Sequence, residues 1–573
     1  MASKDADSSR SRWSDLAFGL VTLGLGLWLI VRPLASLSAL VLAIAAGMVV
    51  AGASRLSDSD RPLPARVSGW LWIAVGAVLL ALPELTVRGL VALVGSYLVI
   101  DGLADIWAGG WGSTDQRFAA FVGGTATVVF GVLALTWPDI TVLVIAVVFA
   151  MRLIVVGFAQ VFGAIRRRRA KEAGSGRLRR WMSTAGAVTA LAVAALLAVV
   201  SSRLNDGAPV VDWFYATPDA MPSQPGELLR IEEFERGIPD DAEAWRILYT
   251  TTRDEGQPAV ASAIVVAPAR REGARNVIAW AHGTTGIDES CAPSILEGTF
   301  ATGAFFSVGE VIDEGWVLVA TDYVGLGTEG PHPYLIGEGE ARSVLDSVRA
   351  ARQIDELELA EGTVVWGHSQ GGHAALWTGV IAPDYAPDVD LIGVAALAPA
   401  SDLIGLIDGL PRVTGGSIFA AYTVSAYAAA FDEVAFADYV VPGGRVTVER
   451  IARRCLAEPS VLTSVLSAVT LDFSVFEPDL TGGELSARLA ANIPLFTPEV
   501  PILLAQGAVD SLVRPELQDR YVAGLCESGG QVDYRKYDGL GHVPLVEADS
   551  PLIPELVEWT RARLSGEPAV STC

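Results

Sequence analysis

The chain has few charged residues: Asp, Glu, Lys and Arg make up 18% of its 573 residues, against about 25% in ordinary soluble domains. Apolar residues make up 51%, and the mean hydropathy is +0.42. These values exclude an intrinsically disordered chain, and they argue against a protein that is soluble along its whole length. A chain of this size is expected to hold several domains.

Histidine and cysteine are absent from residues 1–203. All of them follow that point: His282, His332, His368, His373, His542, Cys291, Cys455, Cys526 and Cys573. No CxxC, HExxH or His/Cys cluster occurs, so we predict no metal site. Because disulfides persist in oxidising compartments, the cysteines hint that the second part of the chain faces outward.

Charge divides the chain at the same place. Residues 1–203 carry 19 Lys and Arg against 11 Asp and Glu, whereas residues 204–573 carry 22 against 54. A basic apolar part followed by an acidic part is typical of a membrane module joined to a water-facing domain. The negative charge of the second part argues against nucleic acid as a partner.

Seven apolar stretches occur in the first part, and most approach the roughly 20 residues that a helix needs to cross a bilayer. They are residues 14–31, 34–53, 68–83, 86–107, 118–137, 140–163 and 182–201. Basic residues gather before the first stretch, after the second and after the sixth, where residues 166–180 read RRRRAKEAGSGRLRR. If every stretch spans, this bias predicts a cytoplasmic N-terminus and an outward-facing second part. A nucleic-acid site at 166–180 is the less favoured alternative.

The first part also repeats internally. A proline in a tight turn is followed 19 residues later by a glycine in three pairs: Pro33 and Gly52, Pro83 and Gly102, Pro138 and Gly157. This pattern resembles the HdeD-like family of small membrane proteins over about residues 13–165. The resemblance implies an all-α multi-pass membrane domain of three helical hairpins, to which the seventh helix adds a tether.

Two acidic residues stand out in this membrane part. Asp101 and Asp105 lie in or near the end of the fourth apolar stretch. An acid within a membrane segment is a functional candidate by default. The alternative, which we favour, places both at the cytoplasmic interface near Trp107.

Strand-like and helix-like segments alternate in the second part. Apolar strands are expected at 276–283, 316–323, 363–372, 392–400 and 501–510, and a helix is expected at 343–354. Such alternation predicts a parallel sheet flanked by helices.

The clearest chemical signal is the segment GHSQG at 367–371, a GxSxG motif between an expected strand and an expected helix. This turn exposes Ser369 as a nucleophile, which then needs an imidazole base and a carboxylate to orient the base. In α/β-hydrolases the acid and the histidine follow the serine in that order. Asp510 ends the last expected strand and His542 follows in a glycine-rich loop, so we predict a Ser369–His542–Asp510 triad.

The tetrahedral intermediate of such a triad needs N–H donors for its oxyanion. We predict that the Gln370 amide supplies one donor and Thr284, with Gly283 beside it, the other; the Thr284 hydroxyl is a further candidate. The segment GLGTEG at 325–330 matches a dinucleotide fingerprint, but the sequence PHP follows it where that site needs a helix. We therefore predict no cofactor.

The second part resembles the secretory lipase family of α/β-hydrolases, the group of fungal lipase A. The resemblance rests on WAHGTTGIDESCAPS, ATDYVGLGTEGPHPYL, ARSVLDSVRAAR, WGHSQGGHAALW and the regions of Asp510 and His542. It implies ester hydrolysis without a cofactor, the same triad, and a disulfide between Cys291 and Cys455. The second disulfide of some members has no clear counterpart here, so the sequence leaves open whether Cys526 and Cys573 are free or paired.

These inferences predict a membrane-anchored carboxylic ester hydrolase, a serine esterase or lipase, at the cell membrane with its active site on the extracytoplasmic side. The expected segments are 1–12 cytoplasmic, 13–165 membrane domain, 166–181 basic loop, 182–203 seventh helix, 204–230 linker with little structure, 231–565 α/β-hydrolase with a helical cap at about 401–495, and 566–573 tail. Acyl esters or lipids are the expected substrates, membrane lipid a partner, and a homo-oligomer can form through the membrane domain. There are two alternatives. One is acyl transfer by the same acyl-enzyme, and the other is a membrane transport or stress-sensing protein with an accessory hydrolase domain.

Overall fold

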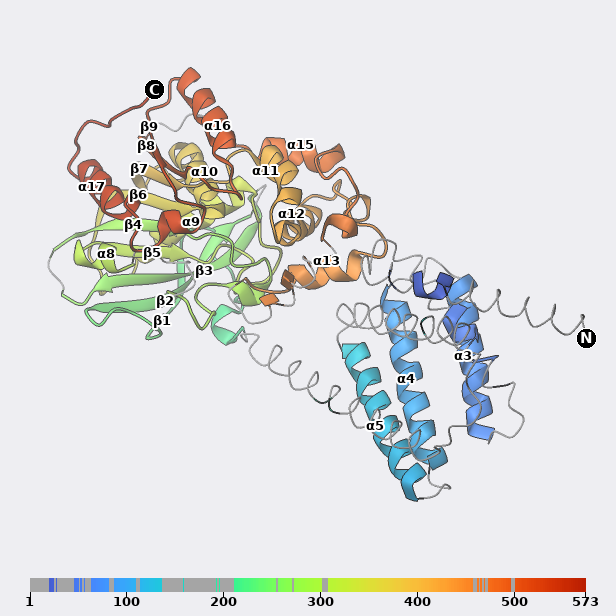
Figure 1. Cartoon of the computed structure of the whole chain (residues 1–573). Coiled ribbons are helices and arrows are strands. Elements are labelled where there is room, and N and C mark those ends of the chain that lie inside the picture. Colours follow the sequence, from blue (N-terminus) through green and yellow to red (C-terminus); the bar gives the residue numbers. More distant parts are fainter. Residues whose placement is uncertain are drawn as a thin grey trace, which may run out of the picture. The chain divides into compact units, whose positions relative to one another are not determined.

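The computed structural model describes residues 63–81, 87–109, 114–136, 211–253, 256–270, 273–300, 308–456, 472–495 and 500–573, with scattered helical residues elsewhere (Figure 1). The chain divides into two units. One comprises Met1–Asp206 with the short segments Val441–Thr447 and Thr470–Val475, and the other comprises the remainder. Each unit is described by itself below.

The described helices of the first unit coincide with three predicted apolar stretches, 68–83, 86–107 and 118–137. They are α3 (Leu63–Ala81), α4 (Val87–Gly109) and α5 (Thr114–Thr136). Within the part of the chain that the structure describes, no helix combines the length and the apolarity that crossing a bilayer requires. The remaining predicted stretches and the basic run lie largely outside the described residues: 14–31, 34–53, 140–163, 182–201 and 166–180.

The glycines predicted to repeat lie where helix backbones approach one another. A Cβ atom on Gly102 of α4 would lie 2.5 Å from the carbonyl oxygen of Gly124 in α5, and one on Gly124 would lie 2.6 Å from the Gly102 oxygen. Gly52 stands in the same relation to Gly69 of α3, at 2.6 Å. Only glycine permits such close packing of helices, so the repeat has a packing cause. The third glycine, at 157, lies outside the described residues.

The second unit is built on a nine-stranded sheet in the order β1-β2-β3-β5-β4-β6-β7-β8-β9. β1 to β3 and the β3–β5 pair are antiparallel, and the strands from β5 to β9 are parallel, so the sheet is mixed. The bounds are β1 (Leu228–Glu233), β2 (Ala242–Thr252), β3 (Pro258–Pro268), β4 (Arg275–Ala281), β5 (Val317–Thr321), β6 (Leu359–His368), β7 (Asp390–Leu397), β8 (Ile502–Gly507) and β9 (Val532–Tyr537). The five predicted strands correspond to β4–β8.

Helices cover both faces of this sheet. On β4, Val277 and Ala279 belong to one apolar core, and Ile278 and Trp280 belong to the core on the opposite face. One face carries α9 (Gly337–Ala351), α10 (Gln370–Tyr385) and α16 (Pro515–Glu527), and the other carries α8 (Val308–Asp313) and α17 (Leu552–Leu564). Because both sides of a central strand are buried, the strand is apolar along its whole length, which made these strands recognisable.

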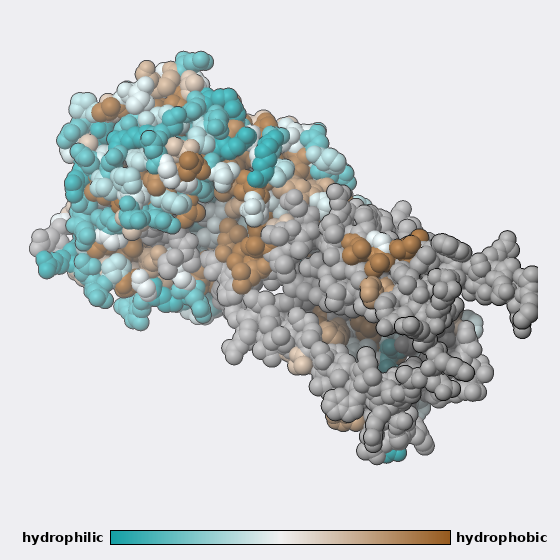
Figure 2. All heavy atoms as spheres, viewed as in Figure 1, coloured by the Kyte–Doolittle hydropathy of each residue, from teal (hydrophilic) through white to brown (hydrophobic). Residues whose placement is uncertain are grey.

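The segment between β7 and β8 is largely helical where it is described. It contains α11 (Leu403–Gly409), α12 (Gly416–Ala430), α13 (Arg445–Ala452) and α15 (Gly483–Ala491). These helices fall within the predicted cap at 401–495. On the face of this unit seen in Figure 2, hydrophilic residues predominate, as its acidic composition leads one to expect.

The prediction of a linker with little structure at 204–230 is wrong for residues 213–215 and for residues 228–230. Trp213–Tyr215 forms a 3₁₀ helix whose Phe214 and Tyr215 are buried, and β1 already begins at Leu228. The Tyr215 hydroxyl lies 2.8 Å from that of Ser294. The two aromatic side chains bury a large apolar surface, which holds this segment against the domain.

The tail at 566–573 is likewise part of the fold, and it contains one partner of the pair that the sequence left open, Cys526 and Cys573. The two cysteines form a disulfide with a Cα–Cα distance of 5.3 Å. The tail reaches this position because it runs beside β9, where the Thr572 amide donates to the Val532 carbonyl at 2.8 Å.

Candidate active site

Ser369 lies at the sharp turn between β6 and α10. Its backbone has φ 58° and ψ −116°, a conformation that a non-glycine residue rarely adopts. Its amide donates to the Leu397 carbonyl at 2.9 Å, and its carbonyl accepts from the amides of His373 and Ala400 at 3.1 Å each. These bonds hold the strained turn in place, so the serine is fixed by the surrounding strands.

The glycines that flank the serine are required by crowding of the backbone. A Cβ atom on Gly371 would lie 1.9 Å from the Ala281 carbonyl oxygen, and one on Gly367 would lie 2.0 Å from the Gly371 oxygen. Neither distance is compatible with a side chain. The GxSxG spacing is therefore the local condition for bringing β6, β4 and α10 this close together.

Ser369, His542 and Asp510 are joined by two hydrogen bonds. The Ser369 Oγ lies 2.8 Å from His542 Nε2, and His542 Nδ1 lies 2.7 Å from Asp510 Oδ2. An ionised carboxylate can only accept, so Nδ1 carries the proton and Nε2 is left to accept from the serine hydroxyl. The three residues predicted from the sequence are thus brought together in the order that a proton relay needs.

The carboxylate of Asp510 is held firmly in the loop after β8. It is 3% exposed, and its Oδ1 accepts from the amides of Leu512 and Val513 at 2.9 Å each. Gln506 Nε2 donates to Oδ2 at 3.2 Å. These bonds hold the carboxylate in the orientation in which Oδ2 meets His542 Nδ1.

The other four histidines have partners elsewhere. His282 and His332 bond to the backbone carbonyls of Asp322 and Val324, at 3.3 and 3.2 Å, and burial lowers their pKa to about 4 and about 3. His373 bonds to Glu340. His368 lies against the His542 ring, with 4.7 Å between ring centroids, and its Nε2 lies 3.2 Å from the His542 carbonyl oxygen. His368 therefore supports the loop that carries His542.

The predicted oxyanion residues lie around the serine. Gln370 begins α10 directly after Ser369, where the first amides of a helix have no partner within it. A Cβ atom on Gly283 would lie 3.8 Å from the Ser369 Cβ, and Thr284 lines a pocket together with Ser369 and Gln370. The Thr284 hydroxyl lies 3.1 Å from the Tyr334 hydroxyl, so the Thr284 side chain already has a hydrogen-bond partner.

Two residues that position Gln370 were missed by reading the sequence. The Gln370 amide nitrogen Nε2 lies 2.8 Å from Glu340 Oε1 and 2.9 Å from His332 Nε2. Glu340 is fully buried, which raises the pKa of its carboxyl group, and it also bonds to His373 at 2.9 Å. The burial of Glu340 could have been predicted, because Glu340 lies four residues before Val344 and eight before Val348. This spacing places it on the apolar face of the expected helix.

An apolar pocket opens at the serine, and the cap helices α11 and α12 supply much of its wall. The residues that line it are Thr284, Tyr334, Leu335, Ser369, Gln370, Ala400, Leu406, Ile407, Leu410, Phe419, Thr423, Leu512 and Val513. Eight of the twelve lining residues besides Ser369 are apolar, so the wall beside the serine favours an aliphatic group of the substrate.

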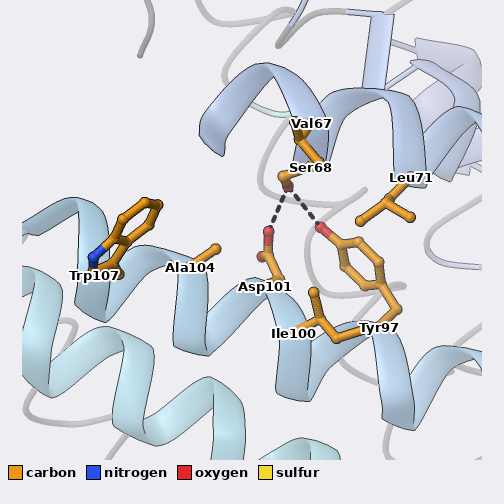
Figure 3. Close-up of a pocket in the computed structure, with 8 residues that line it drawn as sticks. All are labelled: Val67, Ser68, Leu71, Tyr97, Ile100, Asp101, Ala104 and Trp107. Carbon is orange, nitrogen blue, oxygen red and sulfur yellow. Dashed lines mark hydrogen bonds between the residues drawn. The ribbon is translucent and has the colours of Figure 1, made fainter. Parts of the chain in front are cut away.

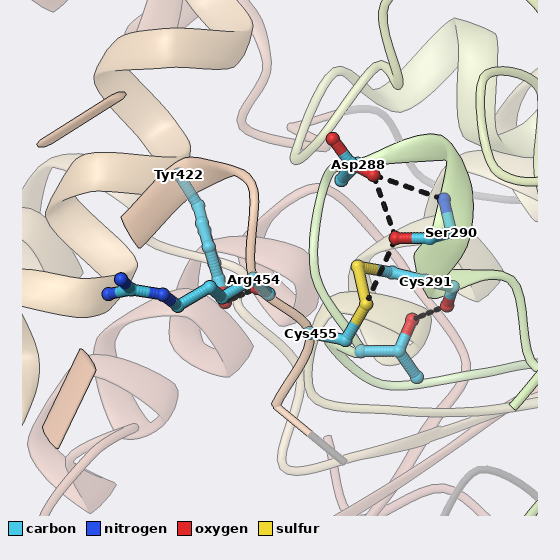
Figure 4. The surroundings of a disulfide bond; sticks show 7 residues. Asp288, Ser290, Cys291, Tyr422, Arg454 and Cys455 are labelled. Carbon is cyan, nitrogen blue, oxygen red and sulfur yellow. Dashed lines mark hydrogen bonds between the residues drawn. A yellow bond between two sulfur atoms is a disulfide. The ribbon is translucent and has the colours of Figure 1, made fainter. Parts of the chain in front are cut away.

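A disulfide joins the cap to the loop that follows the oxyanion segment (Figure 4). Cys291 and Cys455 are bonded, with a Cα–Cα distance of 5.2 Å, as the family resemblance implied. The Thr285 hydroxyl donates to the Cys291 carbonyl at 2.8 Å, and the Leu456 amide donates to the Thr285 carbonyl at 2.8 Å. The neighbour of Thr284 is therefore bonded to both segments that the disulfide connects.

Among residues that the structure describes, no group of His, Cys, Asp and Glu is arranged to hold a metal ion. The segment 325–330 is followed by a loop until α9 begins at Gly337, so the helix that a dinucleotide site requires does not follow it.

Comparison with known proteins finds a family match in each part of the chain. Residues 292–572 match the model of the secretory lipase family. A short repeat of unknown function, DUF308, matches three times, at residues 17–60, 67–131 and 122–199. Three matches equal the number of hairpin repeats predicted from the prolines and glycines.

Two relatives illustrate the range of this family. Secreted triacylglycerol lipase LIP2 of Malassezia globosa is 26% identical over 410 residues, which cover 67% of this chain and 88% of the relative. A protein of Mycobacterium tuberculosis described as a probable inactive lipase, MT1628, is also 26% identical, over 63% of this chain and 83% of its own length.

Solved structures agree on the fold. The X-ray structure of Candida antarctica lipase A superposes with a TM-score of 0.55 at 19% identity, covering 65% of this chain and 88% of that one. The α/β-hydrolase fold predicted for the second part is thereby confirmed. Residues 292–572 of this chain are similar to the secretory lipase family, and the chain is an ester hydrolase of the lipase class.

Proposed function

We propose that the chain is a serine esterase or lipase in which Ser369, His542 and Asp510 form the catalytic triad. Ser369 Oγ attacks the ester carbonyl while His542 Nε2 takes its proton, and Asp510 stabilises the imidazolium that forms. His542 then gives the proton to the leaving alcohol. In the second step His542 Nε2 takes a proton from a water molecule that attacks the acyl-enzyme, and it returns the proton to Ser369 Oγ as the carboxylic acid leaves. The observation that carries the proposal is the pair of hydrogen bonds, 2.8 and 2.7 Å long, at a strained serine.

The oxyanion of the tetrahedral intermediate is stabilised by the backbone N–H groups of Gln370 and Thr284 in this proposal. The Gln370 amide starts a helix, whose N-terminal dipole also favours a negative charge. The side chain of Gln370 is clamped between Glu340 and His332, which supports a fixed position for that amide.

Lipid or other acyl esters are the proposed substrates, because the cap supplies aliphatic side chains to the pocket at Ser369. Relatives named as secreted lipases support an extracytoplasmic hydrolase domain, and the cysteines support an oxidising environment. We propose that the N-terminal helices anchor this domain at the cell membrane. Large apolar side chains exposed on α3, α4 and α5 support the anchor, among them Trp70, Trp107 and Phe121.

The test is labelling of the full chain with a fluorophosphonate probe, which reacts with an activated serine, followed by mass spectrometry of the labelled peptide. We expect the label on Ser369, and we expect Ser369→Ala to lower ester turnover by about 10³-fold or more without loss of folding. Ser511→Ala is the control, because Ser511 is exposed beside Asp510 and has no part in the proposed relay.

Two outcomes contradict the proposal. A folded wild-type chain that takes up no label would group it with the relative described as an inactive lipase. Unchanged turnover in Ser369→Ala would assign the activity to a different nucleophile.

A further inference from the structure

The first unit contains a group of buried polar side chains that the hydrolytic mechanism does not use (Figure 3). The Ser68 hydroxyl of α3 donates to Asp101 of α4 at 2.7 Å, and it lies 3.2 Å from the Tyr97 hydroxyl of the same helix. Side-chain hydrogen bonds of this kind hold apolar helices together. The packing of α3 against α4 therefore accounts for this group.

The α/β unit contains another such group, which reaches the oxyanion segment. Glu340 of α9 and His373 of α10 are both fully buried, and His373 Nδ1 lies 2.9 Å from Glu340 Oε2. The other carboxyl oxygen, Glu340 Oε1, accepts from the side-chain amide of Gln370 at 2.8 Å and from the Leu335 backbone amide at 3.0 Å. Glu340 is therefore bonded directly to the residue whose backbone N–H is proposed to face the oxyanion.

The protons of the pair Glu340 and His373 follow from its hydrogen bonds. His373 Nε2 lies 2.8 Å from the carbonyl oxygen of Asn492, which can only accept, so Nε2 carries a proton. A further proton must lie between His373 Nδ1 and Glu340 Oε2, because two lone pairs would otherwise face each other across 2.9 Å. Whichever group holds that proton, the pair has no net charge. An uncompensated carboxylate here would oppose the negative charge of the oxyanion, and the shared proton removes this repulsion.

Asn492 connects the pair to the cap. It directly follows α15, and its carbonyl oxygen also accepts from Trp377 Nε1 at 3.0 Å. Its side-chain Oδ1 accepts from the backbone amide of Gly337, where α9 begins, at 2.9 Å. One residue of the cap is thus bonded to both helices that carry the pair, α9 and α10.

We propose that Glu340 is a positioning residue for hydrolysis, which acts through the side chain of Gln370 and is neutralised by the proton that it shares with His373. Glu340 and His332 together occupy both N–H groups of the Gln370 side-chain amide, which fixes the start of α10. The inference rests on the proposed function, because the backbone N–H of Gln370 matters only if Ser369 is the nucleophile. That N–H is used in the transition state, so the position of Gln370 affects kcat and leaves KM unchanged.

The test is hydrolysis of p-nitrophenyl butyrate by the full chain and its variants in a non-ionic detergent. Glu340→Met removes both acceptor atoms and keeps the length of the side chain, so we expect kcat to fall by about tenfold or more while KM stays within about twofold. Glu340→Gln keeps an oxygen for Gln370 and can donate to His373, so we expect it to retain kcat within about fivefold of wild type. Glu338→Met is the matched control, because Glu338 is exposed on the same helix and pairs with Arg342.

A second background shows whether Glu340 acts through Gln370. Gln370→Met removes the side-chain amide and keeps the backbone N–H, and we expect it to lower kcat by about tenfold. We expect the double variant Glu340→Met, Gln370→Met to have the kcat of Gln370→Met alone within about twofold, whereas two independent structural defects would multiply. Thermal unfolding of each variant shows that the chains compared are folded.

Multiplied losses of kcat in the folded double variant would overturn the inference. A loss of about tenfold or more in folded Glu340→Gln would do the same, since the hydrogen bonds remain there. Unchanged kcat in Gln370→Met would overturn it even if Glu340→Met does not fold. Ser369→Ala is measured in the same assay: turnover that does not depend on Ser369 would overturn the proposed function, whereas Ser369-dependent turnover with any of these outcomes would overturn this inference alone.

Discussion

Asp322 is a fully buried carboxylate directly after β5. It accepts hydrogen bonds from the Ser262 hydroxyl at 2.6 Å, from the Ser294 hydroxyl at 2.5 Å and from the Ser294 amide at 2.9 Å. Burial nevertheless outweighs these bonds and raises the pKa of Asp322 to about 6. In the unfolded chain the pKa of this carboxyl should be near its ordinary value of about 3.9.

This shift predicts a dependence of stability on pH. Between about pH 4 and pH 6 the folded chain binds more protons at Asp322 than the unfolded chain does, so its contribution to stability falls as pH rises through that interval. Across this interval the raised pKa of Asp322 changes the free energy of unfolding by about 2 to 3 kcal/mol at most. Thermal unfolding across the interval should show Asp322→Asn gaining stability relative to wild type as pH rises. A constant difference between the two would contradict the raised pKa.

Thr284 offers two possible donors, its backbone N–H and its hydroxyl. The hydroxyl already lies 3.1 Å from that of Tyr334. We therefore expect the isosteric variant Thr284→Val to lower kcat by less than about tenfold, whereas loss of an oxyanion donor costs about 10²- to 10³-fold. Thr423→Val is the control, because Thr423 also lines the pocket and its hydroxyl bonds to the Phe419 carbonyl. A hundredfold loss confined to Thr284→Val would make the hydroxyl a donor to the oxyanion.

At the scale of elements, the chain holds two disulfides with different surroundings. Cys291–Cys455 joins the cap to the loop beside the oxyanion segment, and Cys526–Cys573 holds the tail against α16 and β9. Gly286 shows how tightly the first is packed, because a Cβ there would lie 2.5 Å from the Cys291 sulfur. Only the first disulfide is therefore positioned to influence catalysis.

The two disulfides provide a matched pair of variants. Replacing Cys291 and Cys455 with Ser should lower kcat by about tenfold or more, since it loosens the segment that carries an oxyanion donor. Replacing Cys526 and Cys573 should lower stability by about 2 to 4 kcal/mol while kcat stays unchanged. Kinetics of a short-chain ester and thermal unfolding of both double variants separate the two effects. Equal loss of kcat in both would show that the first disulfide has no special role.

For the whole molecule, the two units differ in composition as well as in fold. The N-terminal part is basic and apolar, and the α/β unit is acidic with a largely hydrophilic visible face (Figure 2). The triad, its oxyanion residues and its pocket all belong to the second unit. Hydrolysis should therefore not require residues 1–206.

We expect a chain that begins at Gly207 to hydrolyse a soluble short-chain ester with the kcat/KM of the full chain. We further expect the full chain to sediment with membranes after cell lysis and the shortened chain to remain in the supernatant. Loss of activity in a folded shortened chain would mean that the N-terminal part contributes to catalysis, and equal partition of both chains would contradict the proposed anchor.

Much of this protein was determined by signals that are local in the sequence. The strands β4 to β8 read as apolar runs because both faces of each are buried. The turn at Ser369 was evident from the GxSxG spacing, and the contact that excludes a Cβ on Gly367 arises within the strand–turn–helix unit, from the Gly371 oxygen. The contact that excludes one on Gly371 comes from Ala281 of β4 and was not evident from the sequence. Asp510 and His542 followed from their order after the serine and from the loops in which they lie.

Only the tertiary structure decided which distant residues meet. Glu340 and His332 clamp Gln370, the tail returns to pair Cys573 with Cys526, and Phe214 and Tyr215 turn an apparent linker into part of the domain. Each of these contacts joins segments well separated in the chain, and no local spacing encodes them. They depend on how the helices and loops pack over the sheet, because this packing determines which distant side chains lie close enough to bond.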